Sequence, residues 1–111
     1  MSQAPPSALF TAQARRELAQ AVRWIAQEEP AAARAFRDAV IQAAQRIAQF
    51  PEIGAAREEL APLPVRFLAL PRYRYALVYE ARPHAPPVIL RVVHGARDLP
   101  ALLADPRGRS V

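Results

Sequence analysis

Residues 73–80 read Tyr-Arg-Tyr-Ala-Leu-Val-Tyr-Glu, so that Tyr, Tyr, Leu and Tyr alternate with Arg, Ala, Val and Glu. A period of two is typical of a β-strand with two different faces. The neighbouring stretches 65–70 and 88–93 are also apolar, and the nearly continuous apolar run of 88–93 predicts a central strand. The connections between these stretches are short, which favours an antiparallel meander. We therefore predict a small antiparallel sheet in the second half of the chain.

The first half of the chain has a helical period instead. Residues 12–28 contain neither Gly nor Pro and carry apolar side chains at helical spacing, with Thr11 placed as the N-cap. A second helix is predicted over 31–50, because Pro30 suits a first helical turn and the apolar stripe runs from Ala32 to Phe50. Such a short joint predicts that the two helices form an antiparallel hairpin.

Together these elements predict an α+β fold, in which the helical hairpin packs on one face of the small antiparallel sheet. Residues 8–10 are predicted as a very short strand and 98–103 as a short closing helix. We expect a single domain over 8–104, with a loose N-terminus at 1–7 and a frayed tail at 105–111.

Composition excludes several classes of protein. The chain has 111 residues, 52% of them hydrophobic and 23% charged, as in an ordinary globular domain. It has no cysteine, two histidines and three glycines, and its serines stand only at positions 2, 7 and 110. These counts argue against disulfide scaffolds, thiolate and serine nucleophiles, phosphate-binding glycine loops and dedicated metal sites, so we expect neither a cofactor nor a metal. No apolar run is long enough for a membrane helix and no signal peptide is evident, so we expect a cytoplasmic protein with no membrane partner.

Charge is concentrated in the second half of the chain. All 15 basic residues are arginine, and the net charge is +5. Residues 1–60 carry seven arginines and seven acidic residues, whereas residues 61–111 carry eight arginines and three acidic residues. The second half is therefore expected to face an acidic partner or phosphate.

The candidate functional side chains lie in this basic half. They are Arg66, Arg72, Arg74, Arg91 and Arg97, together with Tyr73, Tyr75, Tyr79 and His94. Such a set suits RNA binding through stacking and phosphate contacts, and also metal-free RNA cleavage with His94 or a tyrosine moving protons. The alternatives are half-buried sheet tyrosines, a hydrogen-bonded structural histidine, and arginines that are solvated or paired, for example with Asp98.

Several segments resemble the RelE/ParE toxin superfamily, and within it the ParE branch of type II toxin–antitoxin (plasmid stabilisation) systems. They are residues 11–18 (TAQARREL), 24–26 (WIA), 30–33 (PAAA), 50–54 (FPEIG), Arg66, 72–79 (RYRYALVY) and 89–99 (ILRVVHGARDL). The last is the most specific, and the resemblance covers about residues 8–103.

This resemblance implies a bacterial toxin that is neutralised by a cognate, ParD-like antitoxin. ParE-type members are inhibitors of DNA gyrase, whereas RelE-type relatives cleave mRNA on the ribosome with basic residues and a Tyr or His near the C-terminus. The chain has no lysine and no aromatic residue or histidine after Asp98, which favours the gyrase inhibitor. The alternatives are an mRNA interferase and an inactive member that only binds antitoxin.

The implied site residues differ between these readings. Candidates for contact with the target are Arg66, Arg72, Arg74, Arg91, His94 and Arg97. An interferase would use Arg66, Tyr79, Arg91, His94 and Arg97.

A surface for the antitoxin is also expected, because a hairpin covers only one face of a sheet. We predict that Phe67, and an apolar row that includes Tyr73 and Tyr75, lie on the uncovered face, and that Trp24 lies off the main stripe of the first helix. An acidic amphipathic segment of the antitoxin would suit both these side chains and the positive charge.

Overall fold

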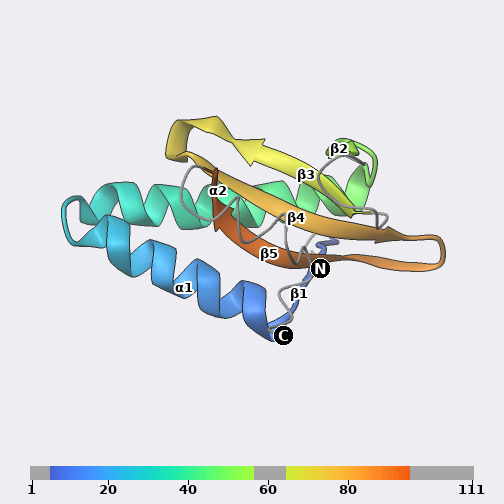
Figure 1. The fold of residues 1–111 in the computed structure, drawn as a ribbon, viewed down its shortest axis with the longest axis horizontal. Coiled ribbons are helices and arrows are strands. Elements are labelled where there is room, and N and C mark those ends of the chain that lie inside the picture. Colours follow the sequence, from blue (N-terminus) through green and yellow to red (C-terminus); the bar gives the residue numbers. More distant parts are fainter. Residues whose placement is uncertain (1–5, 57–64, 96–111) are drawn as a thin grey trace, which may run out of the picture.

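The computed structural model describes residues 6–56 and 65–95, which form two helices beside a sheet (Figure 1). The described strands follow the order β1-β5-β4-β3-β2, with antiparallel pairing throughout except that β1 runs parallel to β5. In chain order the elements are β1 (Leu9–Phe10), α1 (Ala12–Ala26), α2 (Pro30–Gln49), β2 (Ala55–Ala56), β3 (Val65–Leu70), the 3-10 turn η1 (Pro71–Tyr73), β4 (Tyr75–Arg82) and β5 (Ala85–His94). The predicted α+β fold is confirmed, while the parallel pairing of β1 and the short strand β2 were not predicted.

The helix ends follow the expected signals with one exception. Thr11 caps α1 as predicted, since its Oγ1 accepts a hydrogen bond of 3.0 Å from the backbone N–H of Ala14. The prediction that Phe50 continues the buried stripe of α2 is wrong. Phe50 leaves the helical conformation with φ −132° and ψ 79°, and its side chain is 54% exposed. The stripe ends one turn earlier, at the fully buried Ile47.

The sheet has a buried cluster on each face. On the helix side, Tyr75, Leu77 and Tyr79 of β4 pack with side chains of α2 such as Phe36. Val78 alternates with them and belongs to a second cluster on the opposite face, with Val65, Val88, Leu90 and Val93. The predicted placement of the tyrosine row on the uncovered face is therefore wrong, and the apolar residues of that second face are themselves buried.

The strand boundaries differ from the predicted ones at both ends of β4 and β5. The β3 range was predicted correctly, but residues 71–73 form η1 and β4 extends two residues further than expected. The pairing shifts by one residue between Val78 and Tyr79, which pair with Arg91 and Ile89, so that β5 carries a bulge at Leu90.

Some predicted features lie outside the described residues. They are Arg97, the closing helix at 98–103 with Asp98, the tail at 105–111 and most of the N-terminal segment 1–7. Within the ranges 6–56 and 65–95, neither helix has the length and apolar character required to cross a membrane.

Candidate functional site

The described members of the predicted site lie in three different parts of the molecule. Arg66 and Tyr79 lie at the turn between α2 and β2, and Arg91 lies where β5 meets α1. The remaining described members surround the turn between β3 and β4 and are Arg72, Tyr73, Arg74, Tyr75 and His94.

The turn at residues 51–54, between α2 and β2, is held by a tyrosine and an arginine of the sheet. The hydroxyl of Tyr79 donates a hydrogen bond of 2.6 Å to the Pro51 carbonyl and accepts one of 2.9 Å from the Gly54 N–H. Nη1 of Arg66, which pairs with Tyr79 across the strands, donates to the carbonyls of Gly54 at 2.8 Å and Glu52 at 3.3 Å. The polar groups of both side chains are therefore used to fix a turn.

Burial also makes the Tyr79 hydroxyl harder to ionise than an ordinary tyrosine. Its side chain is fully buried, and burial raises the pKa of the hydroxyl above its usual value, although the hydrogen bond from Gly54 and the charge of Arg66 oppose the change. Gly54 leaves no room for a larger residue, because a Cβ there would lie 2.7 Å from Cε1 of Tyr79. The hydroxyl is consequently a buried hydrogen-bond donor at neutral pH.

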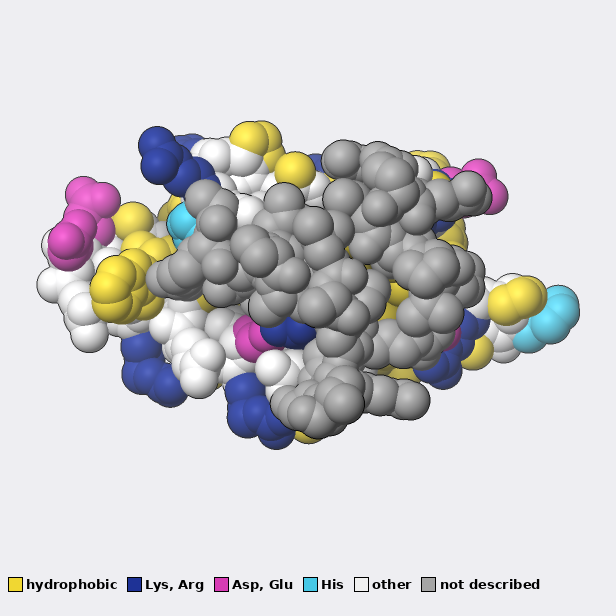
Figure 2. Space-filling view, viewed as in Figure 1, with side chains coloured by type: hydrophobic (Ala, Val, Ile, Leu, Met, Phe, Trp, Pro, Cys, Tyr) yellow, Lys and Arg dark blue, Asp and Glu magenta, His cyan; other side chains and the backbone are white. Residues whose placement is uncertain are grey.

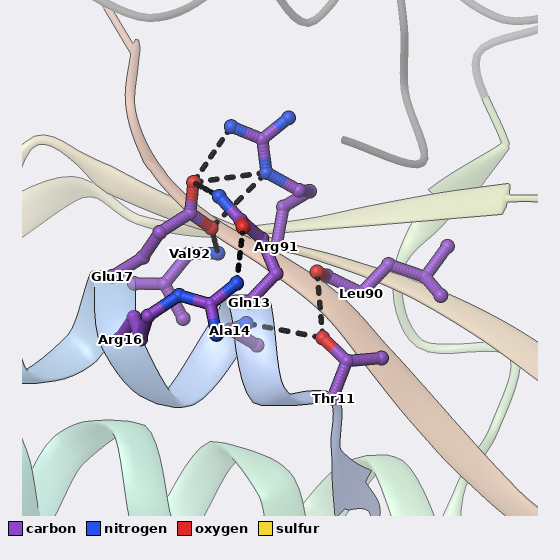
Figure 3. A network of polar contacts seen from close by, with 8 residues as sticks. All are labelled: Thr11, Gln13, Ala14, Arg16, Glu17, Leu90, Arg91 and Val92. Carbon is purple, nitrogen blue, oxygen red and sulfur yellow. Dashed lines mark hydrogen bonds and ion pairs between the residues drawn. The ribbon is translucent and has the colours of Figure 1, made fainter. Parts of the chain in front are cut away.

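Arg91 is paired with Glu17 of α1 at the edge of β5 (Figure 3). Nε donates to both carboxylate oxygens, at 3.1 and 2.9 Å, and Nη2 donates to Oε2 at 2.6 Å. The same carboxylate accepts the backbone N–H of Val92 at 2.9 Å. The side chains of Arg91 and Glu17 are only 12% and 13% exposed, so this pair joins α1 to the sheet.

Glu17 was missed by the sequence analysis. It is the one acidic residue within α1, on a helix that carries Arg15, Arg16 and Arg23. A lone carboxylate among arginines and apolar residues was the signal that could have identified it as the partner of a strand arginine.

The turn between β3 and β4 differs, because its arginine side chains face outward. Arg72 and Arg74 are both exposed, and Figure 2 shows basic side chains at the upper left, beside the place where β3 leads into β4. Arg74 has φ 60° and is the one non-glycine residue with positive φ in the described ranges. Its N–H donates to the Pro71 carbonyl at 3.2 Å, and its carbonyl accepts the N–H of Gly95 at 3.0 Å.

Aromatic contacts fix this turn to α2. The ring of Phe36 lies 5.2 Å from that of Tyr73 and 5.0 Å from that of Tyr75, measured between centroids. Tyr75 also makes an edge-to-face contact of 5.2 Å with His94, its cross-strand partner. With 5% exposure, Tyr75 lies in the core, whereas Tyr73 is half-buried and has the Arg72 guanidinium 5.9 Å from its ring centroid.

The candidate antitoxin contacts are exposed to different degrees. Trp24 is 61% exposed on α1, and Phe67 is half-buried against the second cluster of the sheet. Phe50 and Ile53, at 54% and 38% exposure, are further exposed apolar residues that the sequence analysis did not select.

The described members of the proposed cleavage set do not converge. Tyr79 and the His94 partner Tyr75 are four residues apart on β4, or roughly 13 Å at the usual rise of a strand. Arg91 is held by Glu17 at the strand edge. In the described part of the chain no three or more His, Asp or Glu residues come together in a way that could hold a metal ion.

The helical hairpin on a mostly antiparallel sheet is consistent with a fold of the RelE/ParE type. A family model described as "ParE toxin of type II toxin-antitoxin system, parDE" matches residues 8–99, and the chain belongs to this family. No curated protein matches the chain. The resemblance read from the sequence is confirmed, and a toxin of a type II system implies an antitoxin as its partner.

Proposed function

We propose that this protein is a ParE-type toxin that inhibits DNA gyrase in the cytoplasm and is neutralised by a ParD-like antitoxin. The observation that carries the proposal is that Arg66 and Tyr79 are both engaged at the turn at 51–54, while Arg91 is engaged elsewhere, with Glu17. These are three of the five side chains that the cleavage alternative would require.

Metal-free cleavage of RNA places strict demands on geometry. A general base, a general acid and a positive charge must all reach one phosphodiester group at hydrogen-bond distance. Tyr79 is fully buried and neutral, and it lies roughly 13 Å along β4 from the position opposite His94. Inhibition by binding requires no such assembly and is compatible with arginines that act one at a time.

Antitoxin binding is proposed to begin at Trp24. An exposed tryptophan on a helix is a suitable anchor for an apolar side chain of a partner. Tyr73 and Phe67 present only part of their surface, and Tyr75 lies in the core against Phe36, the ring that Tyr73 also contacts. An acidic amphipathic segment would combine contact with Trp24 and attraction to the net positive charge.

Two parallel assays with the purified full-length protein test the proposed target. The first follows supercoiling of relaxed plasmid by gyrase, and the second follows mRNA integrity in a purified translation reaction. We expect loss of supercoiling with trapped, cleaved DNA, and intact mRNA. Cut mRNA with normal supercoiling would overturn the proposal in favour of an interferase that uses His94 and Arg97. Inactivity in both assays would favour a family member that only binds antitoxin.

A further inference from the structure

The turn between β3 and β4 carries two exposed arginines, neither of which is paired with a carboxylate in the described ranges, although the Arg72 guanidinium lies over the Tyr73 ring. We propose that Arg72 and Arg74, here called the basic turn, bind the phosphate backbone of duplex DNA. This inference rests on the proposed function, because duplex DNA is the substrate of gyrase. It adds a nucleic-acid contact made by the toxin itself.

The backbone of Arg74 gives the first argument. A left-handed conformation costs free energy in any residue with a Cβ, and glycine is the usual occupant of such positions. Arg74 adopts it with φ 60° and is fixed there by its hydrogen bonds to Pro71 and Gly95. Residues held in sparsely populated conformations gather at functional sites, and the side chain placed here is a large cation.

The charges of the basic turn give the second argument. In the described part of the chain, neither Arg72 nor Arg74 has a carboxylate oxygen within 4.0 Å, whereas Arg91 and Arg82 each do. A guanidinium presents five N–H donors in a fixed plane that matches a phosphate or carboxylate. Both guanidinium groups are thus available for an external anion.

The surroundings of the basic turn favour phosphate over an acidic polypeptide. The large hydrophobic residues that are exposed in the described ranges are Leu9, Trp24, Phe50 and Ile53, and none belongs to this turn, whose Tyr73 is half-buried against Phe36. Protein partners usually require a buried aromatic or apolar anchor, whereas the DNA backbone is bound through charge and hydrogen-bond donors alone. The turn also lies along the outer edge of the molecule, where β3 leads into β4 above the helices in the view of Figure 1.

Rigidity strengthens this argument, since a contact that is already ordered loses little entropy on binding. The packing of Tyr73 on Phe36, and the hydrogen bond from Gly95 to Arg74, hold the turn between α2 and β5. The basic turn therefore combines fixed backbone geometry with free side-chain charge.

The test measures binding of the full-length protein to a labelled duplex of about 20 bp by fluorescence anisotropy, over roughly 50 to 200 mM salt. The variant is Arg72→Gln combined with Arg74→Gly. The matched control is Arg46→Gln combined with Arg82→Gln, which removes the same charge from the C-terminal ends of α2 and β4. Each lost phosphate contact lowers the slope of log affinity against log salt by about one.

We expect the variant to lose about two from this slope and roughly tenfold or more in affinity, while the control retains the wild-type slope. The variant should melt no lower than the wild type, because glycine relieves the conformation at position 74. Equal DNA binding by the variant and the control would overturn the proposal. The proposal would also be overturned if the variant lost as much affinity for a polyglutamate peptide as for DNA. That result would favour an acidic polypeptide as the partner.

Gyrase assays of the same proteins separate the two proposals. If the wild type inhibits supercoiling and the variant binds DNA normally, the proposal that the basic turn binds DNA is refuted and the gyrase proposal stands. If the wild type leaves gyrase active and the variant has lost DNA binding, the gyrase proposal fails and the DNA contact stands.

Discussion

Two turns of this molecule are built from similar residues and use them in opposite ways. The turn at 51–54 and the turn at 71–74 both begin with proline, and each is associated with a tyrosine and an arginine. At the first, Tyr79 and Arg66 direct their polar groups into the turn. At the second, Arg74 holds the turn with its backbone and leaves its side chain exposed.

The difference arises from the backbone groups that each turn leaves unpaired. The carbonyl of Pro51 and both the N–H and the carbonyl of Gly54 are bonded by side chains from β3 and β4. In the other turn, the N–H of Arg74 bonds to Pro71 and its carbonyl to Gly95, so that no side chain is required. An arginine near a turn is therefore structural where the backbone lacks partners, and available for binding where the backbone supplies its own.

The largest effect is expected where an arginine is most fully engaged. Glu17→Ala removes the partner of Arg91 and the acceptor of the Val92 N–H in a contact that is mostly buried. We expect a loss of about 3 kcal/mol in the free energy of unfolding, measured by urea denaturation. The control Glu28→Gln changes an exposed carboxylate and should cost less than about 0.5 kcal/mol. A loss below about 1 kcal/mol for Glu17→Ala would contradict a structural role for the contact between Arg91 and Glu17.

The next prediction compares Gly54, in the first turn, with Gly95, whose N–H bonds to the second turn. A Cβ at Gly54 would lie 2.7 Å from Cε1 and 2.8 Å from the hydroxyl of Tyr79, whereas a Cβ at Gly95 would lie 3.7 Å from the Arg74 carbonyl oxygen. We expect Gly54→Ala to lower the free energy of unfolding by about 2 kcal/mol and Gly95→Ala to change it by less than about 0.5 kcal/mol. Equal effects of the two substitutions, in the same denaturation experiment, would contradict the close packing of the first turn.

The tyrosine hydroxyls provide a third comparison. Tyr79→Phe leaves the buried Gly54 N–H and the Pro51 carbonyl without their partner and should cost about 1–2 kcal/mol. Tyr73→Phe at the other turn keeps the ring contact with Phe36 and should cost less than about 0.5 kcal/mol. Thermal unfolding of both variants checks the difference, and similar melting temperatures would show that the Tyr79 hydroxyl does not hold the turn.

The same hydroxyl predicts a response to alkaline pH. Burial raises the pKa of Tyr79 in the folded state, so the unfolded chain loses this proton first as the pH rises. The contribution to stability is complete below the usual tyrosine pKa of about 10 and is lost as the pH rises through the folded value. Denaturation at increasing pH should show this loss in the wild type and less of it in Tyr79→Phe. Parallel curves for the two proteins would contradict it.

The sequence predicted the fold because its patterns are local. The helical spacing, the Thr11 cap and the alternation along β4 each depend on neighbouring residues, and these predictions are confirmed. The face of the tyrosine row was predicted wrongly because alternation separates two faces without saying which one meets the helices. Val78 of the other row is buried as well, in the second cluster, whereas Ala76 and Glu80 beside it are half-buried.

The site was less predictable for a related reason. Whether Arg91 is free depends on Glu17, which is 74 residues away, and the β5 bulge beside Arg91 is hidden within a continuous apolar run. The exposure of Phe50 depends on where α2 ends, and the helical spacing alone would continue through it. Sequence patterns thus gave candidate residues for a site, and long-range contacts decided which of their side chains remain available.

The smallest expected effect is a gain in stability rather than a loss, and it concerns only the turn at 71–74. Arg74→Ala removes the side chain but retains a Cβ at φ 60°, whereas Arg74→Gly removes both, so the glycine variant should be more stable than the alanine variant by about 1 kcal/mol. Neither variant removes the backbone bonds to Pro71 and Gly95, and both should therefore fold like the wild type. If denaturation shows Arg74→Gly to be less stable than the wild type, the guanidinium contributes to folding after all. If Arg74→Gly is more stable than the wild type, the arginine at this position stands there at a cost to stability, as a binding side chain would.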